Sequence, residues 1–392
     1  MGTTRILATK QTALLLVLFT VAAVRQVSAR SATASAELGQ PGFTTSTCDN
    51  PLLTSPQQLC HPAGVAVDNH SGLLFVADGD NNRILIWPSA TKFRNGEPAS
   101  AVLGQPSFAI GGKCTGGTTA STICDPNGLA VDTLGHLFVS DTDGDRILRF
   151  SPPFSNGMAA DMVIGQRSFT TSICGVDAST LCHPRGVALD ASGNLFVADS
   201  NNNRVLVFEA PLTSGESASL LIGQAAFNDK HCNRSGSPGP QTLCGPRGVI
   251  LDPAGNLYVA EDDNSRVLEF NDPLHSPTTD ISASRVFGQP DFSASTCGVG
   301  PTSLCNPDDV ALGTSGQLII SDKGNNRLLV FDSPLANTVA NQVIGQPDFF
   351  SNTAATTASG LASPKGLAVD RAGNLYVTDE DNNRVLRFDR AE

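Results

Sequence analysis

GVALDASGNLFVADSNNNRVLVF, the stretch from Gly186 to Phe208, recurs with modest changes as GLAVDRAGNLYVTDEDNNRVLRF from Gly366 to Phe388. More divergent copies begin at Gly64, Gly128, Gly248 and Asp309, so the pattern occurs six times along the chain. Repetition at a long and nearly constant spacing is typical of solenoids, propellers and arrays, which use one supersecondary unit throughout. The architecture therefore follows from how a single repeat folds.

Each repeat has the pattern of four short β-strands. In the third copy, β-rich runs alternate with Gly, Asn and Asp clusters that are typical of turns, and these runs are 186–189, 194–198, 205–208 and 220–224. Four antiparallel strands repeated radially make a β-propeller, which leaves only short sheet edges exposed. We therefore predict an all-β, six-bladed β-propeller with blades at about 64–105, 128–166, 186–224, 248–289, 309–346 and 366–389.

The two ends of the repeat region complement each other. Residues 36–40 (AELGQ) match the fourth strand of the other repeats, whereas the last repeat stops after its third strand at Phe388. The N-terminal strand is therefore expected to complete the last blade, which removes an edge strand that would otherwise seek a partner. A ring closed in this way is one domain, which we place at 30–392.

The repeat resembles a known family. It reads P-x-G-[VL]-A-[VL]-D, then G-x-L-[FY]-V-[AST]-D, then [DN]-x-N-R-[IV], and this pattern is similar to the NHL repeat. The resemblance implies a six-bladed propeller and extends over the chain that follows the first 29 residues. The departures are local: Asp309 replaces a glycine, Gly313 an aspartate, Glu261 an aspartate and Ser265 an asparagine.

Ten cysteines are distributed as one pair in each of five repeats. The sixth repeat has Ala354 and Ala362 at the same two positions, so both partners are missing together. This is expected of bonded pairs, because a single orphan thiol is reactive. We predict five local disulfides, which join Cys48 to Cys60, Cys114 to Cys124, Cys174 to Cys182, Cys232 to Cys244, and Cys297 to Cys305. Metal ligation would require C-x-x-C-like clusters, which are absent from the sequence.

The first 29 residues have the composition of an export signal. Arg5 and Lys10 precede an apolar run at 11–24, and Val27-Ser28-Ala29 provides a small-residue cleavage pattern. The apolar run is short for a membrane span, although retention as an anchor is the alternative. The chain carries a formal charge of -12, and a secreted or extracytoplasmic location is predicted. Such an acidic protein lacks the basic footprint of nucleic-acid binding, including the RNA binding of some NHL proteins.

Several candidate chemistries have a structural alternative. An acidic residue and an arginine five positions later recur in every blade, for example Asp199 and Arg204, which favours an ion pair that clamps the turn over a ring of catalytic carboxylates. Each repeat also has a Gly-Gln segment that leads to a phenylalanine, whose burial is expected to anchor the loop. The acidic turn at 141–145 lacks the glycine and glutamate that an EF-hand requires. No metal or other cofactor is predicted.

The position after the proline that precedes each first strand is expected to lie near the mouth of the central channel, on the face where loops can carry function. Around the ring this position holds Ala63, Asn127, Arg185, Arg247, Asp308 and Lys365. The asymmetric charges suggest a pocket for an anionic or polar ligand at Asn127, Arg185, Arg247, Asp308 and Lys365. Alternatively, Asp308 and Asp309 neutralise their cationic neighbours and nothing binds.

The predicted function is a scaffold that binds a small polar ligand or another protein, without nucleic acid or membrane as partner. The channel-mouth positions contain no histidine, which is the zinc ligand of the related amidating lyase, and do not match the Asn, Asp and Glu set of the calcium-dependent lactonases. A hydrolase or lyase acting at the channel mouth is the alternative. Two N-x-S/T sequons, at Asn69 and Asn233, are possible glycosylation sites in predicted turns or loops.

Overall fold

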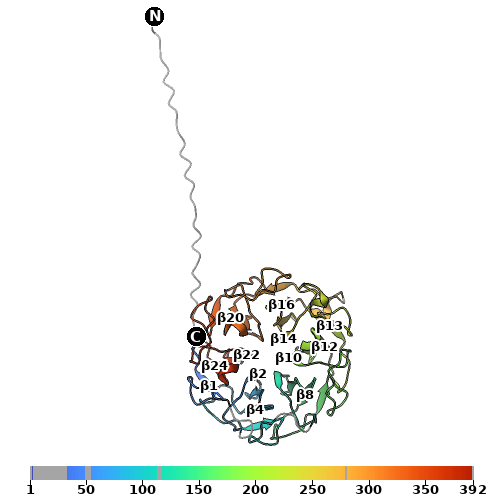
Figure 1. Cartoon of the computed structure of the whole chain (residues 1–392), viewed down its shortest axis with the longest axis vertical. Helices are drawn as coiled ribbons and strands as arrows, with labels where there is room; N and C mark the ends of the chain where they lie inside the picture. The colour runs from blue at the N-terminus through green and yellow to red at the C-terminus, as the bar shows by residue number, and fades with distance from the viewer. Residues whose placement is uncertain (1, 3–32, 49–53, 113–116, 279, 391–392) are drawn as a thin grey trace.

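The computed structural model describes residues 2, 33–48, 54–112, 117–278 and 280–390. They form six four-stranded antiparallel sheets arranged as a ring (Figure 1), so the predicted all-β six-bladed propeller is confirmed. The helical elements within these residues are short 3-10 turns, namely η1 (Ser200–Asn202), η2 (Cys232–Ser235), η3 (Pro273–His275), η4 (Lys323–Asn325) and η5 (Glu380–Asn382). Within the same residues, no helix is both long and apolar enough to cross a membrane. The predicted export signal, 1–29, lies outside the described residues, with the exception of Gly2.

The strands follow the predicted pattern in each blade. Blades one to three contain β2 (Pro62–Val67), β3 (Leu74–Asp78), β4 (Arg83–Trp87), β5 (Ala101–Leu103); β6 (Pro126–Val131), β7 (Leu137–Asp141), β8 (Arg146–Phe150), β9 (Met162–Ile164); and β10 (Pro184–Leu189), β11 (Leu195–Asp199), β12 (Arg204–Phe208), β13 (Leu220–Ile222). Blades four to six contain β14 (Pro246–Leu251), β15 (Leu257–Glu261), β16 (Arg266–Phe270), β17 (Arg285–Phe287); β18 (Val310–Leu312), β19 (Leu318–Asp322), β20 (Arg327–Phe331), β21 (Gln342–Ile344); and β22 (Pro364–Val369), β23 (Leu375–Asp379), β24 (Arg384–Phe388) with β1 (Ala36–Leu38).

The strand register defines two faces of the ring. Pro62, at the start of β2, pairs with Asp78, at the end of β3, so the innermost strand begins beside the hairpin turn between β3 and β4. The amide of Cys60 donates to Asp78 (2.7 Å), which brings the cysteine loop to the same place. We call this side of the ring the disulfide face. The turns between the first and second strands, such as that between β2 and β3, lie on the opposite face.

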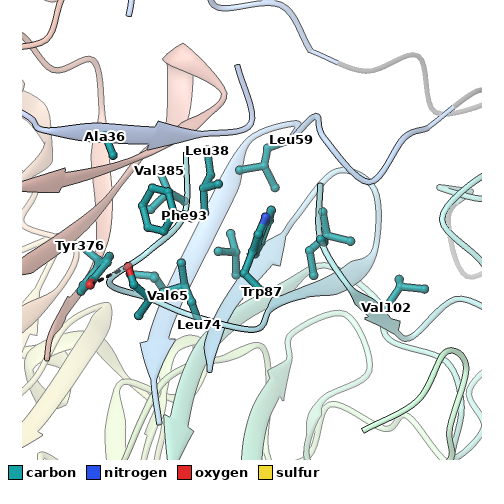
Figure 2. Packing of buried hydrophobic residues seen from close by; sticks show 14 residues of the cluster. Ala36, Leu38, Leu59, Val65, Leu74, Trp87, Phe93, Val102, Tyr376 and Val385 are labelled. Carbon is teal, nitrogen blue, oxygen red and sulfur yellow. Dashed lines mark hydrogen bonds between the residues drawn. The ribbon is translucent and has the colours of Figure 1, made fainter. Parts of the chain in front are cut away.

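The ring is closed by the N-terminal strand, as predicted. β1 pairs antiparallel with β24, with Ala36 opposite Arg387 and Leu38 opposite Val385. Figure 1 shows the two strands side by side at the edge of the last blade, and Figure 2 shows Leu38 and Val385 packed near Trp87 of the first blade. All three side chains are fully buried, so the closing strand joins the first and last blades through one apolar cluster.

The repeated acidic residue and arginine form a fully buried ion pair in each blade. In the third blade, Nε of Arg204 lies 2.7 Å from Asp199, and the guanidinium also donates to the carbonyls of Phe227 and Thr180, which lie in the two flanking loops. The corresponding arginine bonds the carbonyl of the loop phenylalanine in all six blades, namely Phe108, Phe169, Phe227, Phe292, Phe349 and Phe43. The predicted structural role of the pair is confirmed, since each pair holds a hairpin turn to the loops beside it.

A second six-fold contact connects neighbouring blades. The last residue of each hairpin turn has a left-handed backbone, which asparagine tolerates better than most residues, as at Asn203 (φ 53°). Its side-chain oxygen accepts the amide of the residue after the second cysteine position of the next blade, for example Gly245 (2.7 Å). The same bond joins Asn383 to His61 (2.8 Å) across the point of closure. The sequence pattern gave no indication of this contact, because it depends on two blades.

Four of the five predicted disulfides are present in the described residues. They join Cys48 to Cys60, Cys174 to Cys182, Cys232 to Cys244, and Cys297 to Cys305. Cys114, the predicted partner of Cys124, lies outside the described residues. The cysteine-free loop of the sixth blade keeps the same turn, because the amide of Ala355 donates to Leu361 (3.0 Å) as that of Gly298 donates to Leu304 (3.1 Å). The disulfides are therefore not needed to shape the loops.

Replacing Cys297 and Cys305 together by alanine is expected to lower the free energy of unfolding by about 2–3 kcal/mol, because the cross-link restricts the unfolded chain. The loop should keep its shape, as its counterpart with Ala354 and Ala362 does. Denaturant unfolding of the oxidised protein measures the change. A crystal structure of the double variant with a rearranged loop would contradict this account.

Candidate functional site

The central channel is narrowest at the disulfide face, where the six innermost strands meet. A Cβ atom at Gly64 would lie 2.0 Å from the carbonyl oxygen of Asn127, and one at Gly186 would lie 2.1 Å from that of Arg247. Glycine is therefore required at these positions by the close approach of neighbouring backbones. The remaining space has a volume of about 30 Å³ and is lined in part by Ala63, Asn127, Arg247 and Asp308. We call this space the constriction.

Asp309 occupies the position that is glycine in the other five blades, and it is one of the residues that line the constriction. The carboxylate accepts the amides of Leu367 and Val310, each at 2.8 Å. Burial raises the pKa of Asp309 to about 7, the two amides oppose this shift, and Asp308 adds to it. Asp309 therefore bonds to backbone amides and does not neutralise a neighbouring cation.

Asp308 and Arg247 form an ion pair at the channel mouth. Nη1 of Arg247 lies 3.0 Å from Asp308, and Nη2 contacts Asp262. Burial by itself would raise the pKa of Asp308, but the positive charges of Arg247, Lys365, Lys323 and Arg185 lower it below its usual value. Asp308 is therefore held ionised, and the guanidinium of Arg247 is shared between two carboxylates. For this pair, the predicted alternative of mutual neutralisation agrees with the geometry.

The other two predicted cations lie outside the lining of the constriction. Lys365 is 2.5 Å from Glu380, which also pairs with Lys323 at 3.2 Å. Arg185 is partly exposed, and none of the carboxylates in the described residues lies within 4.0 Å of it. Of the predicted set, Asn127, Arg247 and Asp308 thus line the constriction, and Arg185 is the cation of the set that forms no ion pair with the residues that the structure describes.

The channel widens toward the opposite face into a second cavity of about 1200 Å³, which we call the apolar chamber. Val65, Leu129 and Val187 line both spaces, so the chamber continues from the constriction along the innermost strands. Its walls come from β2, β6, β10, β14, β18 and β22. The chamber was not predictable from the sequence, because apolar residues on a first strand face either the core between blades or the channel, and strand alternation does not distinguish these two.

The two predicted glycosylation sites, Asn69 and Asn233, differ in how exposed their side chains are. Asn69 is exposed in the turn after β2, where its side-chain oxygen accepts the amide of Arg371 (2.7 Å). Asn233 is only 7% exposed and exchanges two hydrogen bonds with Asn264, at 3.1 and 2.9 Å.

The described residues also contain two groups of side chains with metal-ligating atoms. These groups are Cys48, Cys60 and His61, and Asp145, Cys174, Cys182 and His183. The cysteines of both groups are in disulfides, which leaves too few donors for a zinc site.

Comparisons with known proteins agree with this architecture. The NHL repeat family matches residues 59–87, 181–208, 304–331 and 361–388. Human teneurin-4 is 23% identical over 338 residues, which cover 82% of this chain and 11% of teneurin-4. Protein brain tumor of Drosophila melanogaster is 26% identical over 158 residues, which cover 40% of this chain and 12% of that protein. The chain therefore spans about a tenth of the length of these relatives.

Two solved structures share the fold. A protein of unknown function from Bacteroides thetaiotaomicron superposes with a TM-score of 0.57 and 16% identity, over 90% of this chain and 75% of its own. A gluconolactonase from Xanthomonas campestris superposes with a TM-score of 0.52 and 16% identity, over 88% of this chain and 97% of its own. At this identity the likeness concerns the fold alone. Four segments of the chain therefore match the NHL repeat, and the chain forms a six-bladed β-propeller with disulfide-bonded loops between its blades.

Proposed function

We propose that this propeller is an exported interaction scaffold that binds an acidic group of its partner at Arg185 on the disulfide face. The buried ion pairs and the bonds between blades recur in all blades and serve the fold. The channel mouth, in contrast, differs from blade to blade. Four disulfides are compatible with an extracellular location, where such bonds persist.

The observation that carries the proposal is the environment of Arg185. Arg247 and Lys365 already have carboxylate partners within the protein, whereas Arg185 has none within 4.0 Å among the described residues. A guanidinium can bind a carboxylate through two parallel hydrogen bonds, and it is weakly hydrated for a cation.

The alternative, a hydrolase or lyase at the same mouth, is favoured by one residue only. Asp309 has a pKa of about 7, which suits general acid–base chemistry. However, the constriction around it has a volume of about 30 Å³, which is space for one water molecule and not for a substrate. The geometry therefore supports binding at Arg185 better than catalysis at Asp309.

The test is calorimetric titration of the mature, oxidised protein with tetraglutamate, and with tetralysine as the probe of opposite charge. Arg185→Ala should weaken tetraglutamate binding about tenfold or more, because a hydrogen bond to a charged group contributes about 1.5–3 kcal/mol. Arg167→Ala, at an exposed arginine in the loop after β9, is the matched control and should leave the affinity unchanged. Absence of tetraglutamate binding, or equal affinities of Arg185→Ala and the wild type, would overturn the proposal.

A further inference from the structure

We infer that the apolar chamber is a binding site for a small molecule with an apolar body and a cationic group. The chamber lies at the other end of the channel from Arg185, so this inference does not depend on the proposed function. Its volume of about 1200 Å³ is slightly above the range typical of small-molecule sites, about 300–1,000 Å³, so the chamber has room for a small molecule. The chamber is open to solvent at the opposite face and could admit a ligand without rearrangement of the blades.

The walls that the six innermost strands provide to the chamber are apolar. Each innermost strand contributes aliphatic side chains, among them Val67, Val131, Leu189, Leu251, Leu312 and Val369. These side chains are partly exposed, in contrast to the fully buried side chains between the blades. A contiguous apolar surface of this kind is uncommon on a protein that has no use for it. An apolar ligand body would remove this surface from water.

The chamber departs from the six-fold symmetry at Leu335, in the loop between β20 and β21. The loops of the preceding three blades have Phe154, Leu212 and Leu274 at the same place, immediately after a proline. Those three side chains are partly buried against the apolar clusters between blades. Leu274 and Leu335 both line the chamber, but Leu335 is 48% exposed, whereas Leu274 is partly buried. A contact made within the fold elsewhere is therefore left available to a ligand in the fifth blade.

A second departure concerns the hydroxyl of Tyr258, which also lines the chamber. The corresponding tyrosine of the last blade, Tyr376, donates to Ala90 (2.9 Å), as Figure 2 shows, and is also 2.9 Å from Asp370. The Tyr258 side chain is 1% exposed, and its hydroxyl makes no hydrogen bond to the residues that the structure describes. This hydroxyl is a polar contact in the chamber wall that a ligand can use.

The charge of the lining selects the sign of the ligand. Among the residues that the structure describes, the lining includes four aspartates, Asp190, Asp252, Asp272 and Asp332, and no lysine or arginine. The histidine of the lining, His275, lies 2.8 Å from Asp272, so its charge is offset locally when it is protonated. An ammonium group would be attracted at this rim, and a carboxylate would be repelled. A fatty acid is therefore a poor occupant, and an apolar amine is a good one.

The experiment compares decyltrimethylammonium with decanoate by calorimetric titration of the oxidised full chain, with both probes below their micelle-forming concentrations. Both probes are built on a ten-carbon chain, so their apolar parts are of similar size, and they carry opposite charges. Saturable binding of the cation, at least tenfold tighter than that of decanoate, is expected. Tyr258→Phe, which removes one hydroxyl, should leave the preference for the cation intact.

Leu335→Lys places a positive charge in the chamber wall at an exposed position, where folding is not at risk. It should weaken the binding of decyltrimethylammonium at least tenfold and improve that of decanoate. Leu134→Lys is the matched control, because Leu134 is 74% exposed in the turn between β6 and β7 and does not line the chamber. No saturable binding of the cation, equal affinity for both probes, or equal effects of the two lysine variants would overturn the inference.

Discussion

Replacing Arg204 by methionine is expected to lower the free energy of unfolding by about 3–5 kcal/mol, because removal of one partner leaves a buried charge uncompensated. Arg204 and Asp199 are both fully buried, and the guanidinium also holds the carbonyls of the flanking loops. Burial raises the pKa of Asp199 to about 6 even though Arg204 opposes the shift. In the variant this carboxyl should therefore take up a proton, and part of the lost stability should return at low pH.

Denaturant unfolding at pH 5 and pH 8 measures both effects. The double variant Asp199→Asn/Arg204→Met should be more stable at pH 8 than the single Arg204 variant, since the orphaned charge is gone. Arg149→Met is the matched control: its ion pair with Asp161 (2.7 Å) is partly exposed, and its loss should cost less than about 1 kcal/mol. Equal losses for Arg204→Met and Arg149→Met would show that the buried pair does not hold the blade.

Glu37 in the closing strand β1 is expected to lower the free energy of unfolding by about 3 kcal/mol as the pH rises, and replacing it by valine should remove this loss. Glu37 lies opposite Leu386 in β1, and its side chain is 0% exposed. The five other fourth strands have Val102, Val163, Leu221, Val286 and Val343 at this place. Burial raises the pKa of Glu37 to about 7, and the charge of Arg384, 3.6 Å away, opposes the shift.

The sign of the effect follows from the protons bound. Between pH 4.5 and 7 the unfolded chain has lost the proton of Glu37 while the folded protein keeps it, so folding weakens as the pH rises through this window. The difference in stability between Glu37→Val and the wild type should therefore grow in favour of the variant from pH 4.5 to pH 8. Glu209→Gln, at an exposed glutamate, is the control and should give a difference independent of pH. A pH-independent difference for Glu37→Val would contradict the buried, protonated state of Glu37.

The candidate site was predictable in part. The six positions after the prolines were expected near one channel mouth, and four of them line the constriction. The pairing of Arg247 with Asp308 was not predictable, because these residues are 61 positions apart and meet only when neighbouring blades pack. The apolar chamber was missed for a related reason, since it is a space enclosed by six strands and no single repeat contains it.

What the sequence by itself determined was the blade. Strand alternation, the turn residues and the spacing of each cysteine pair depend on neighbours within one repeat, and six copies of one repeat close into one ring. Only the tertiary structure determined which side chains are protonated, which cations have an ion-pair partner, and where the cavities lie. Whether Glu37 is protonated, whether Arg185 has a partner, and whether Leu335 is covered depend on atoms from other blades. Their burial and local electrostatic field exist only after the ring has closed, so no pattern along the chain encodes them directly.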